Sequence, residues 1–245
     1  ADGVADTADS DADRSNGKVA ITAPASGENS LTSPDDPTID AGLIKLVSIG
    51  DYVWWDNDRD GQQGDDELPV PGVTVNLLDS SGNLLATTTT DDEGFYSFTD
   101  LLAGATYQVV FVKPDHTVFT DSNVGDDSSD SDPNPLGAVL VVAPSEGANS
   151  AETPDDPTID AGLVKLVSIG DYVWWDNNRD GKQTLGEPVV PGVTVNLYDA
   201  DGQFVGTTTT NGVGFYSFAD LFAETDYTVE FVKPEGTWFT TQDVP

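Results

Sequence analysis

The sequence has no cysteine and a single histidine, His116, and these scarcities limit its chemistry. Without cysteine there is no disulfide and no thiolate chemistry. His116 is replaced by Gly236 at the equivalent position of the repeat described below, so we interpret it as a loop residue and not as a general base. There is also no nucleophile elbow and no glycine-rich phosphate loop. We therefore predict that the chain is not an enzyme.

Basic residues are also scarce, with 9 lysines and arginines against 44 aspartates and glutamates and a formal net charge of −35. Nucleic acid is excluded as a partner, because phosphate binding needs basic patches. Binding to anionic membrane surfaces is disfavoured for the same reason. No apolar run approaches the ~20 residues of a membrane span, and no signal peptide is visible. The acidity fits both a saline habitat and multiple calcium sites, and composition does not separate these two interpretations.

The densest group of acids lies in the loop 56–67, "DNDRDGQQGDDE", which directly follows two tryptophans. Its carboxylates alternate along the chain, a glycine follows the third, and a glutamate closes the loop, as in the D-x-[DN]-x-[DN]-G-x₅-E calcium pattern. Calcium accepts six to eight oxygen ligands, including main-chain carbonyls and bidentate glutamate. The predicted ligands are Asp56, Asp58, Asp60, the main-chain oxygen of Gln62, and Glu67.

Two long motifs recur along the chain with one period. "VSIGDYVWWD" begins at Val47 and Val167, and "PDDPTIDAGL" begins at Pro34 and Pro154, so the period is 167 − 47 = 154 − 34 = 120 residues. The chain is thus predicted to contain the closing part of an incomplete repeat (1–46), a complete calcium-binding repeat (47–166) and the opening part of a third repeat (167–245).

Alternating and β-branched residues dominate the complete repeat, and no long stretch has a helical period. We therefore predict an all-β fold of tandem immunoglobulin-like antiparallel β-sandwiches with about seven strands each. The expected strands lie near 47–55, 72–79, 83–90, 94–99, 105–113, 137–142 and 158–164.

If successive strands alternate in direction, three acidic loops lie at the same end of the sandwich. A further segment at 117–120 could add a strand and change this parity. So many carboxylates at one end would repel one another without cations, which predicts a shared cluster of several calcium ions per repeat. The second and third loops add the candidate ligands Asp91, Asp92, Asp126, Asp127, Asp130 and Asp132.

The calcium pattern returns one period later. The matching residues are Asp176, Asn178, Asp180, Gly181 and Glu187. Because the whole region is duplicated, the second match adds little independent support. The flanking residues are typical of strands, so the helix–loop–helix fold of an EF-hand is not implied.

Three further motifs carry a resemblance to a known family: "IGDYVW" before the acidic loop, "PGVTVNL" from Pro71 and "GFYSF" from Gly94. In combination they resemble the B domains of serine–aspartate repeat adhesins, which are calcium-binding stalk modules related to collagen-adhesin B-type domains. The resemblance covers essentially the whole chain. It implies a β-sandwich spacer that calcium rigidifies, with ligands at the first-loop residues given above and at Asp176, Asn178, Asp180, Lys182 (main-chain oxygen only) and Glu187.

The leading functional hypothesis is structural, namely an extracellular stalk, adhesin or filament whose repeats are arranged head-to-tail. The junction "LIKLV" (43–47) has no glycine, proline or serine, unlike a flexible linker. The alternative is a surface module that binds carbohydrate or another ligand through an exposed tryptophan of Trp54–Trp55 or Trp174–Trp175; we expect the other tryptophan of each pair to enter the core. A surface-layer component is a third possibility.

The incomplete repeats at the two ends predict completion by a neighbour. Residues 1–46 of one copy would finish the module that residues 167–245 of another begin, since each alone would expose an unpaired sheet edge. Separate subunits could exchange strands, or the repeats could belong to one long polypeptide; the absence of start or stop signals favours the second.

Overall fold

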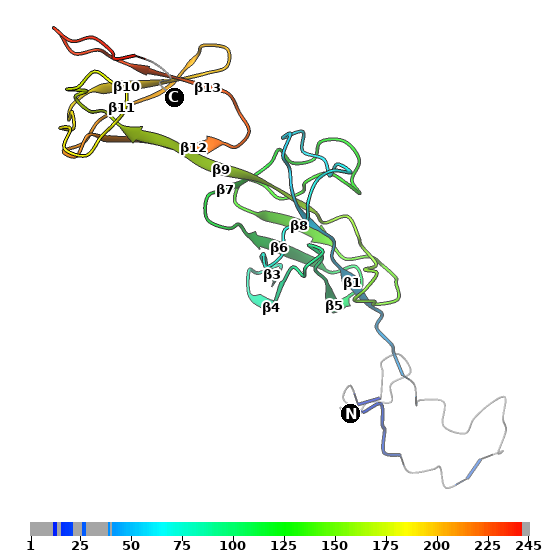
Figure 1. Cartoon of the computed structure of the whole chain (residues 1–245). Helices are drawn as coiled ribbons and strands as arrows, with labels where there is room; N and C mark the ends of the chain where they lie inside the picture. The colour runs from blue at the N-terminus through cyan, green and yellow to red at the C-terminus, as the bar shows by residue number, and fades with distance from the viewer. Residues whose placement is uncertain (1–11, 14–15, 22–25, 28–38, 40, 242–245) are drawn as a thin grey trace.

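A computed structural model describes residues 12–13, 16–21, 26–27, 39 and 41–241. Nearly all of the incomplete repeat 1–46 therefore lies outside the described residues, and its predicted strand arrangement with it. The rest is all-β and elongated, with two modules placed end to end (Figure 1). No helix of the described residues has the length and apolar character needed to cross a membrane.

The first module is a β-sandwich with one central core, and its strands pair in antiparallel fashion except for one parallel pair described below. Its strands are β1 (Leu46–Ile49), β2 (Val53–Trp55), β3 (Thr74–Asp79), β4 (Leu84–Thr89), β5 (Phe98–Leu102), β6 (Thr106–Val112), β7 (Thr117–Phe119), β8 (Ala138–Val142) and the first half of β9 (Ala161–Tyr172). One sheet has the order β4-β3-β6-β8, while β1 pairs with β5, and β9 pairs with β2 and β7. Alternate residues of β3 and β6 point inward, because successive side chains of a strand face opposite sides.

The predicted first strand, 47–55, is two strands in the structure. The break follows Gly50, where an added Cβ would lie 2.2 Å from the carbonyl oxygen of Tyr96. Such close backbone approach is possible only for glycine, but it does not by itself end a strand, because a Cβ at Gly170 would lie 2.4 Å from the Tyr216 carbonyl oxygen within the continuous strand β9 (Ala161–Tyr172). The segment 117–120 indeed adds the short strand β7. The complete module therefore has nine strand segments where about seven were expected.

The second module repeats the first one's local pairing. Its strands are the second half of β9 together with β10 (Thr194–Asp199), β11 (Phe204–Thr209), β12 (Phe215–Phe222) and β13 (Tyr227–Phe231). The hairpin β10–β11 has the same register as β3–β4, since Thr194 pairs with Thr209 and Thr74 with Thr89. Its described core is smaller and contains Val195, Leu197, Tyr216, Phe218 and Leu221.

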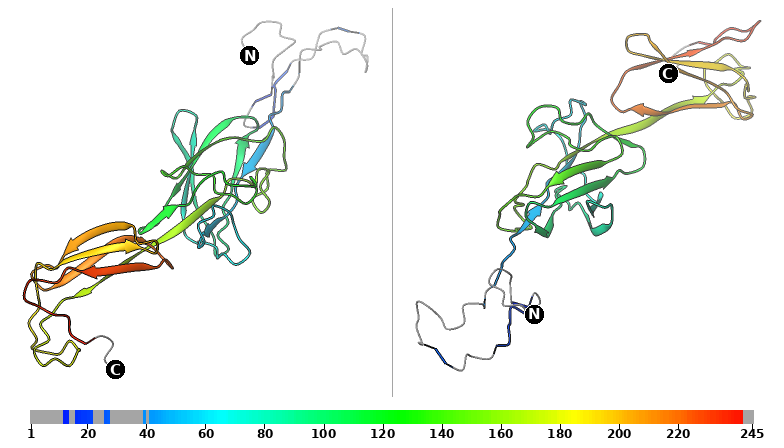
Figure 2. Two further views of the ribbon diagram at one scale, coloured as in Figure 1. Left: turned by 90° about the horizontal axis from the view of Figure 1, so that it is seen from above. Right: turned by 180° about the vertical axis from the view of Figure 1, so that it is seen from behind.

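The two modules share strand β9, which runs from one into the other (Figures 1 and 2). Its first residues pair in parallel with β2 and in antiparallel fashion with β7. Its later residues, from Leu166 to Tyr172, pair with β12 of the second module. The equivalent of the junction 43–47, one period later, is part of one continuous strand with ladder hydrogen bonds on both sides of the module boundary. The stiffness of the junction stays a prediction.

Candidate metal centre

The first acidic loop (56–67) is organised around Asp56, which is buried at the end of β2. One carboxylate oxygen accepts a hydrogen bond from the backbone N–H of Arg59, and the other accepts one from Gly61 at 3.0 Å. Gly61 has a φ of 80° and lies against the carbonyl of Asp121. The glycine that the calcium pattern requires thus makes the sharp turn expected of it.

Asp56, Asp58 and Asp60 form the first triad, because each offers a carboxylate oxygen within 4.8 Å of the others. Glu67 holds the two ends of the loop together: Oε1 accepts from Asn57 N at 2.7 Å and Oε2 from Gly64 N at 2.9 Å, and its ligation of calcium stays a prediction. Burial, followed by the charges of Asp56 and Asp58, raises the pKa of the Glu67 carboxyl against the lowering effect of these two hydrogen bonds. Gln62 follows the triad, with its N–H donating to Asp60 at 2.8 Å.

A second acidic loop (121–132) lies directly beside the first. Gln63 N donates to Ser129 O at 2.7 Å, and Ser131 N donates to Gly61 O at 3.1 Å. This loop forms the second triad, whose carboxylate oxygens also lie within 4.8 Å of one another: Asp127, Asp130 and Asp132. Two of the three acidic loops predicted to meet at one end of the sandwich therefore do meet.

Asp130 is the most informative member of the second triad. Its side chain is only 4% exposed, and its Oδ1 atom has no hydrogen-bond partner. Burial, with the nearby charges of Asp127 and Asp126, raises the pKa of its carboxyl. An ionised carboxylate that is buried without a donor is costly, whereas a cation would satisfy it.

Behind the second triad lies a buried carboxyl pair, Asp51 and Asp160, that the sequence analysis did not identify. The two side chains lie within hydrogen-bond distance of each other, and Asp160 is 1% exposed. Asp160 Oδ1 accepts from Tyr52 N at 3.3 Å, while Oδ2 has no hydrogen-bond donor. Asp132 Oδ2 accepts from Asp160 N at 2.7 Å, which links the pair to the triad.

Burial is the main cause of the raised pKa values of the carboxyls in this region. It raises the pKa of Asp51 to about 7, and together with the charge of Asp51 it raises the pKa of Asp160 to about 9. The pKa of Asp132 is raised to about 7, again chiefly by burial. Both Asp51 and Asp160 belong to the repeated motifs, but only the three-dimensional structure shows that these motifs are in contact.

The third predicted acidic loop, which contains Asp91 and Asp92, contributes no residue to the two triads. The Asp91 Oδ1 atom accepts hydrogen bonds from Glu93 N at 3.0 Å and Phe95 N at 2.9 Å, so it stabilises its own turn. Asp92 is exposed, and neither residue belongs to the triads. Asp126 is exposed next to the second triad, and its carbonyl accepts from Asp130 N. Metal ligation by these three side chains stays a prediction.

The loop of the second module has the same internal hydrogen bonds as the first. Asp176 accepts from Gly181 N at 2.9 Å, and Glu187 accepts from Asn177 N at 3.0 Å and Thr184 N at 2.9 Å. In the same loop, Asn178 Nδ2 donates to Asp180 Oδ2 at 2.9 Å and Lys182 N donates to Asp180 Oδ1 at 2.8 Å. In the first loop of this module Asn178 takes the place of Asp58, so that loop has one carboxylate fewer at the triad positions.

One tryptophan of the first pair enters the core, as expected, since Trp54 is fully buried. Trp55 is half-buried, and the Lys165 ammonium lies 4.3 Å from the centre of its ring. In the complete module, therefore, β9 contributes the side chain that covers this ring, which argues against an open sugar-stacking platform there.

Arg59 connects the first acidic loop to the second module. Its Nη1 donates to Thr225 Oγ1 at 2.9 Å, and its guanidinium lies 4.8 Å from the centre of the Phe222 ring. Both partners belong to the β12–β13 hairpin, across the module boundary. The candidate metal loop therefore touches the next module directly.

We expect Arg59→Ala to loosen the junction while leaving the fold of each module intact. An exposed cation–π contact contributes about 0.5–1 kcal/mol, enough to shift a bending equilibrium several-fold. Spin labels on Ser81→Cys and Asp201→Cys, at exposed turns of the two modules, would report this as a broader inter-module distance distribution. Arg179→Ala, at the equivalent position of the second loop, is the control and should leave the width unchanged. Equal widths for all three proteins would contradict this role of Arg59.

Comparison with known proteins identifies the modules. The model of the SdrD B-like domain matches residues 47–163 and 167–245. Serine-aspartate repeat-containing protein I of Staphylococcus saprophyticus is 42% identical over 216 residues, which is 87% of this chain and 11% of that protein. Serine-aspartate repeat-containing protein D of Staphylococcus aureus (strain Newman) is 40% identical over 209 residues, covering 84% and 15%. The chain thus spans only a small part of the length of these relatives.

Solved structures give a more distant likeness. The shaft pilin SpaA from Lactobacillus rhamnosus GG aligns over 79% of this chain and 90% of its own, with 14% identity and a TM-score of 0.32. GBS52, the minor pilin of Streptococcus agalactiae, aligns over 78% and 84%, with 14% identity and a TM-score of 0.32. On the family match and the sequence relatives, the chain belongs to the SdrD B-like domain family and is a non-enzymatic tandem repeat of the kind found in serine-aspartate repeat surface proteins.

Proposed function

We propose that this chain is a structural, calcium-rigidified repeat of an extracellular stalk, adhesin or filament, arranged head-to-tail with neighbouring copies or repeats. The observation that carries the calcium assignment is the buried Asp130 with its unpartnered Oδ1, inside a triad of carboxylates. An acidic surface needs no explanation beyond solvation, but a buried carboxylate oxygen without a donor does. A divalent cation supplies the missing partner.

Calcium fits these loops better than magnesium. The candidate ligands are carboxylate and main-chain oxygens on irregular loops, together with a closing glutamate that can bind through both oxygens. Calcium accepts six to eight such ligands in flexible geometry, whereas magnesium demands a near-ideal octahedron and retains several waters. Soft metals are disfavoured, since the chain contains no cysteine.

The mechanical role follows from what the acidic loops bind. Asp56 N donates to Leu163 O at 3.0 Å, and Asp132 N donates to Asp160 O at 3.1 Å. The Ser131 hydroxyl accepts from Gly162 N at 3.1 Å. Both loops thus hold the first half of β9, the strand that continues into the next module. Cations that fix the loops would also fix this strand and hence the angle between modules.

An extracellular location is supported by membership of the SdrD B-like domain family. The family relatives named above are serine-aspartate repeat proteins, which supports a place within a longer surface protein.

The number of bound ions tests the proposal. Equilibrium dialysis followed by elemental analysis should find at least two calcium ions in the first module, and Asp58→Asn and Asp130→Asn should each weaken or remove one of them. Asp201→Asn, in an exposed turn outside both loops, is the matched control and should leave the stoichiometry unchanged. Indistinguishable calcium binding by all four proteins would reduce the triads to solvated surface.

A further inference from the structure

One face of the first module carries no charged side chain. It is the outward side of the sheet β4-β3-β6-β8, since the intervening residues of β3, β6 and β8 point into the core. We call it the uncharged face. It consists of every second residue from Thr74 to Leu78, from Thr106 to Val112 and from Ala138 to Val142, together with the β4 residues that pair with those of β3.

The lack of charge on this face is unusual for the chain. Aspartate, glutamate, lysine and arginine make up 22% of all residues, and the net charge is −35. The solvated face of an antiparallel sheet normally carries polar and charged side chains. Here the most exposed members are apolar instead, since Leu84 is 62% exposed, Leu140 71% and Val142 63%. Exposed apolar patches of this kind are typical of interaction surfaces.

The polar members of the face are partly paired with one another. Thr87 of β4 lies opposite Asn76 of β3, and its hydroxyl donates to Asn76 Oδ1 at 2.8 Å. Polar groups that already have a partner cost less to bury than groups that rely on water. The uncharged face can therefore be covered by another protein surface at a small cost in lost hydration.

The second module shows that the fold itself does not require an uncharged face. Glu230 lies opposite Asn196 in the register in which Val110 lies opposite Asn76. The Glu230 Oε2 atom accepts hydrogen bonds from Asn196 Nδ2 at 2.8 Å and from the Tyr198 hydroxyl at 3.0 Å. A carboxylate is thus accommodated at this place on the sheet, and its absence from the first module needs another reason.

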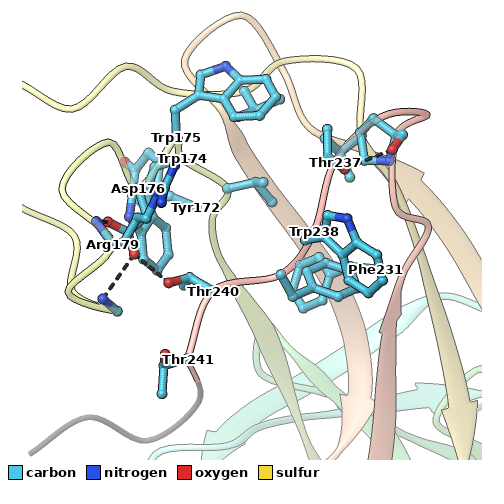
Figure 3. A pocket seen from close by; sticks show the side chains of 16 residues that line it. Tyr172, Trp174, Trp175, Asp176, Arg179, Phe231, Thr237, Trp238, Thr240 and Thr241 are labelled. Carbon is cyan, nitrogen blue, oxygen red and sulfur yellow. Dashed lines mark hydrogen bonds between the residues drawn. The ribbon is translucent and has the colours of Figure 1, made fainter.

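Apolar side chains also gather elsewhere in the second module, but there they are mixed with charges. Trp175 and Trp238 line a pocket of about 730 Å³, and Asp176 and Arg179 line the same pocket (Figure 3). The uncharged face of the first module differs from this pocket because it is a flat sheet surface without any ionised group.

A second copy of the chain fits the uncharged face better than an unlike partner. Two chains that each carry a net charge of −35 repel each other wherever their acidic surfaces meet. Two uncharged faces can meet without bringing carboxylates together. A basic partner, by contrast, would be attracted to the acidic loops and not to this face.

The size of the face predicts a weak contact. Four strands spaced about 4.8 Å apart, each with about five residues rising about 3.3 Å, span a flat area of roughly 300 Å². A standard protein interface buries about 800 Å² of accessible surface on each partner, so this contact belongs with the small, transient interfaces. Its measurement therefore needs high protein concentrations.

We propose that two copies of this chain associate side by side through their uncharged faces. The two sheets pack face to face, as the two layers of a β-sandwich do, about 10 Å apart. Because both copies use the same surface, the contact has two-fold symmetry and closes at a dimer. This lateral contact goes beyond the head-to-tail arrangement proposed above and does not depend on it.

Sedimentation at increasing protein concentration tests the contact. In millimolar calcium we expect the mass to approach twice the 25.8 kDa of one chain and to stop there. Leu140→Asp should raise the dissociation constant of this dimer at least about tenfold, because it brings like charges together in the contact. Leu136→Asp is the matched control. Leu136 is 86% exposed but lies outside the face, so the same substitution there should leave the dissociation constant unchanged.

Val110→Glu is a second variant that the fold should tolerate, because the second module has Glu230 at the same place. We expect it to weaken the dimer by a similar factor while leaving the melting temperature in calcium unchanged, which separates weaker association from unfolding. Raising the salt concentration should strengthen the dimer of the unmodified chain, because screening reduces the repulsion between two acidic chains.

Three results would overturn the proposal. The first is a chain that stays monomeric up to millimolar concentration in high salt. The second is equal weakening by Leu140→Asp and Leu136→Asp, which would reflect added net charge and not the face. The third is growth beyond a dimer that Leu140→Asp leaves unchanged, which would be head-to-tail assembly without a lateral contact. Calcium stoichiometry should be the same for Leu140→Asp and the unmodified chain, so failure of the lateral contact is distinguishable from failure of calcium binding.

Discussion

Removal of calcium should lower the melting temperature of the first module by on the order of 15 °C for each ion lost. At a free calcium concentration 1,000 times the Kd, one bound ion contributes about 4 kcal/mol to the free energy of unfolding. For a domain of this size, 1 kcal/mol corresponds to roughly 4 °C or more. Chelation also leaves the carboxylates within each triad without a cation to offset their mutual repulsion, and this lowers the free energy of unfolding further.

The measurement is differential scanning calorimetry in millimolar calcium and in chelator, with high salt in both. High salt screens the exposed charges, so any remaining difference reports specific sites. Proteolysis should accelerate in chelator within residues 56–67 and 121–132, because the backbone hydrogen bonds between these loops are only the two from Gln63 N to Ser129 O and from Ser131 N to Gly61 O. Superimposable melting curves would show that the cations contribute nothing to stability.

The second module should respond more weakly to the same treatment. Its loop has two aspartates and Asn178 in the triad positions, and Asn178 already donates to Asp180. Asp176 Oδ2 already accepts hydrogen bonds from Gly181 N and from the Thr240 hydroxyl. A site with fewer charges and better satisfied oxygens gains less from calcium. Calorimetry should therefore show one calcium-sensitive transition that is clearly larger than the other.

The sequence was sufficient to predict features that depend on local pattern. Alternating residues predicted β3, β4 and β6 to within two residues of their observed ends, because strand periodicity is set by burial on one face. The spacing of Asp56, Asp58 and Asp60 predicted their convergence, because the loop turns at Gly61. The junction without glycine, proline or serine predicted a stiff connection; the equivalent residues 163–167 lie within the continuous strand β9, and the stiffness itself stays a prediction.

Features that depend on contacts between distant segments were not predictable in the same way. The predicted strand 47–55 is divided into β1 and β2, whereas the equivalent residues of the second module continue in one strand as far as Tyr172. The local sequence is the same in both copies, so it does not decide where the strand ends. The Asp51–Asp160 pair was missed because its members are 109 positions apart and each looks like one more acid in an acidic chain. Only the β2–β9 pairing brings them together.

That carboxyl pair should make the chelated protein more stable at pH 5.5 than at pH 8. The folded-state pKa values are raised to about 7 for Asp51 and about 9 for Asp160, against about 3.9 for an unfolded chain. At pH values between the unfolded-state pKa and the folded-state pKa of each carboxyl, the folded state binds more protons than the unfolded state. The free energy of unfolding therefore decreases as pH rises, by up to about 1.4 kcal/mol per pH unit for each such proton. Asp132, with a pKa of about 7, acts in the same direction.

This trend is opposite to that of an ordinary stabilising carboxylate. Asp79, for example, has a lowered pKa because Asn83 donates hydrogen bonds to it, and its stabilising effect is lost only when the pH falls below the usual range of Asp. The window from pH 5.5 to pH 8 avoids that region. In saturating calcium the decrease of the free energy of unfolding with rising pH should become shallower or reverse. Calcium binds the ionised carboxylates of the second triad, so protons then compete with the cation for them.

Asp51→Asn separates the pair from the rest of the acidic surface. The amide keeps the shape of the side chain but cannot ionise, so Asp160 loses a neighbouring charge and the slope in chelator should become shallower. Asp171→Asn is the matched control, because Asp171 occupies the equivalent position of the second module and is exposed. Thermal melting at half-unit pH intervals would give the slopes. If the melting temperature of the unmodified protein in chelator does not change with pH, the pair is ionised throughout. If it falls steeply as pH rises, and Asp51→Asn but not Asp171→Asn removes this fall, the buried carboxyls hold protons whenever calcium is absent.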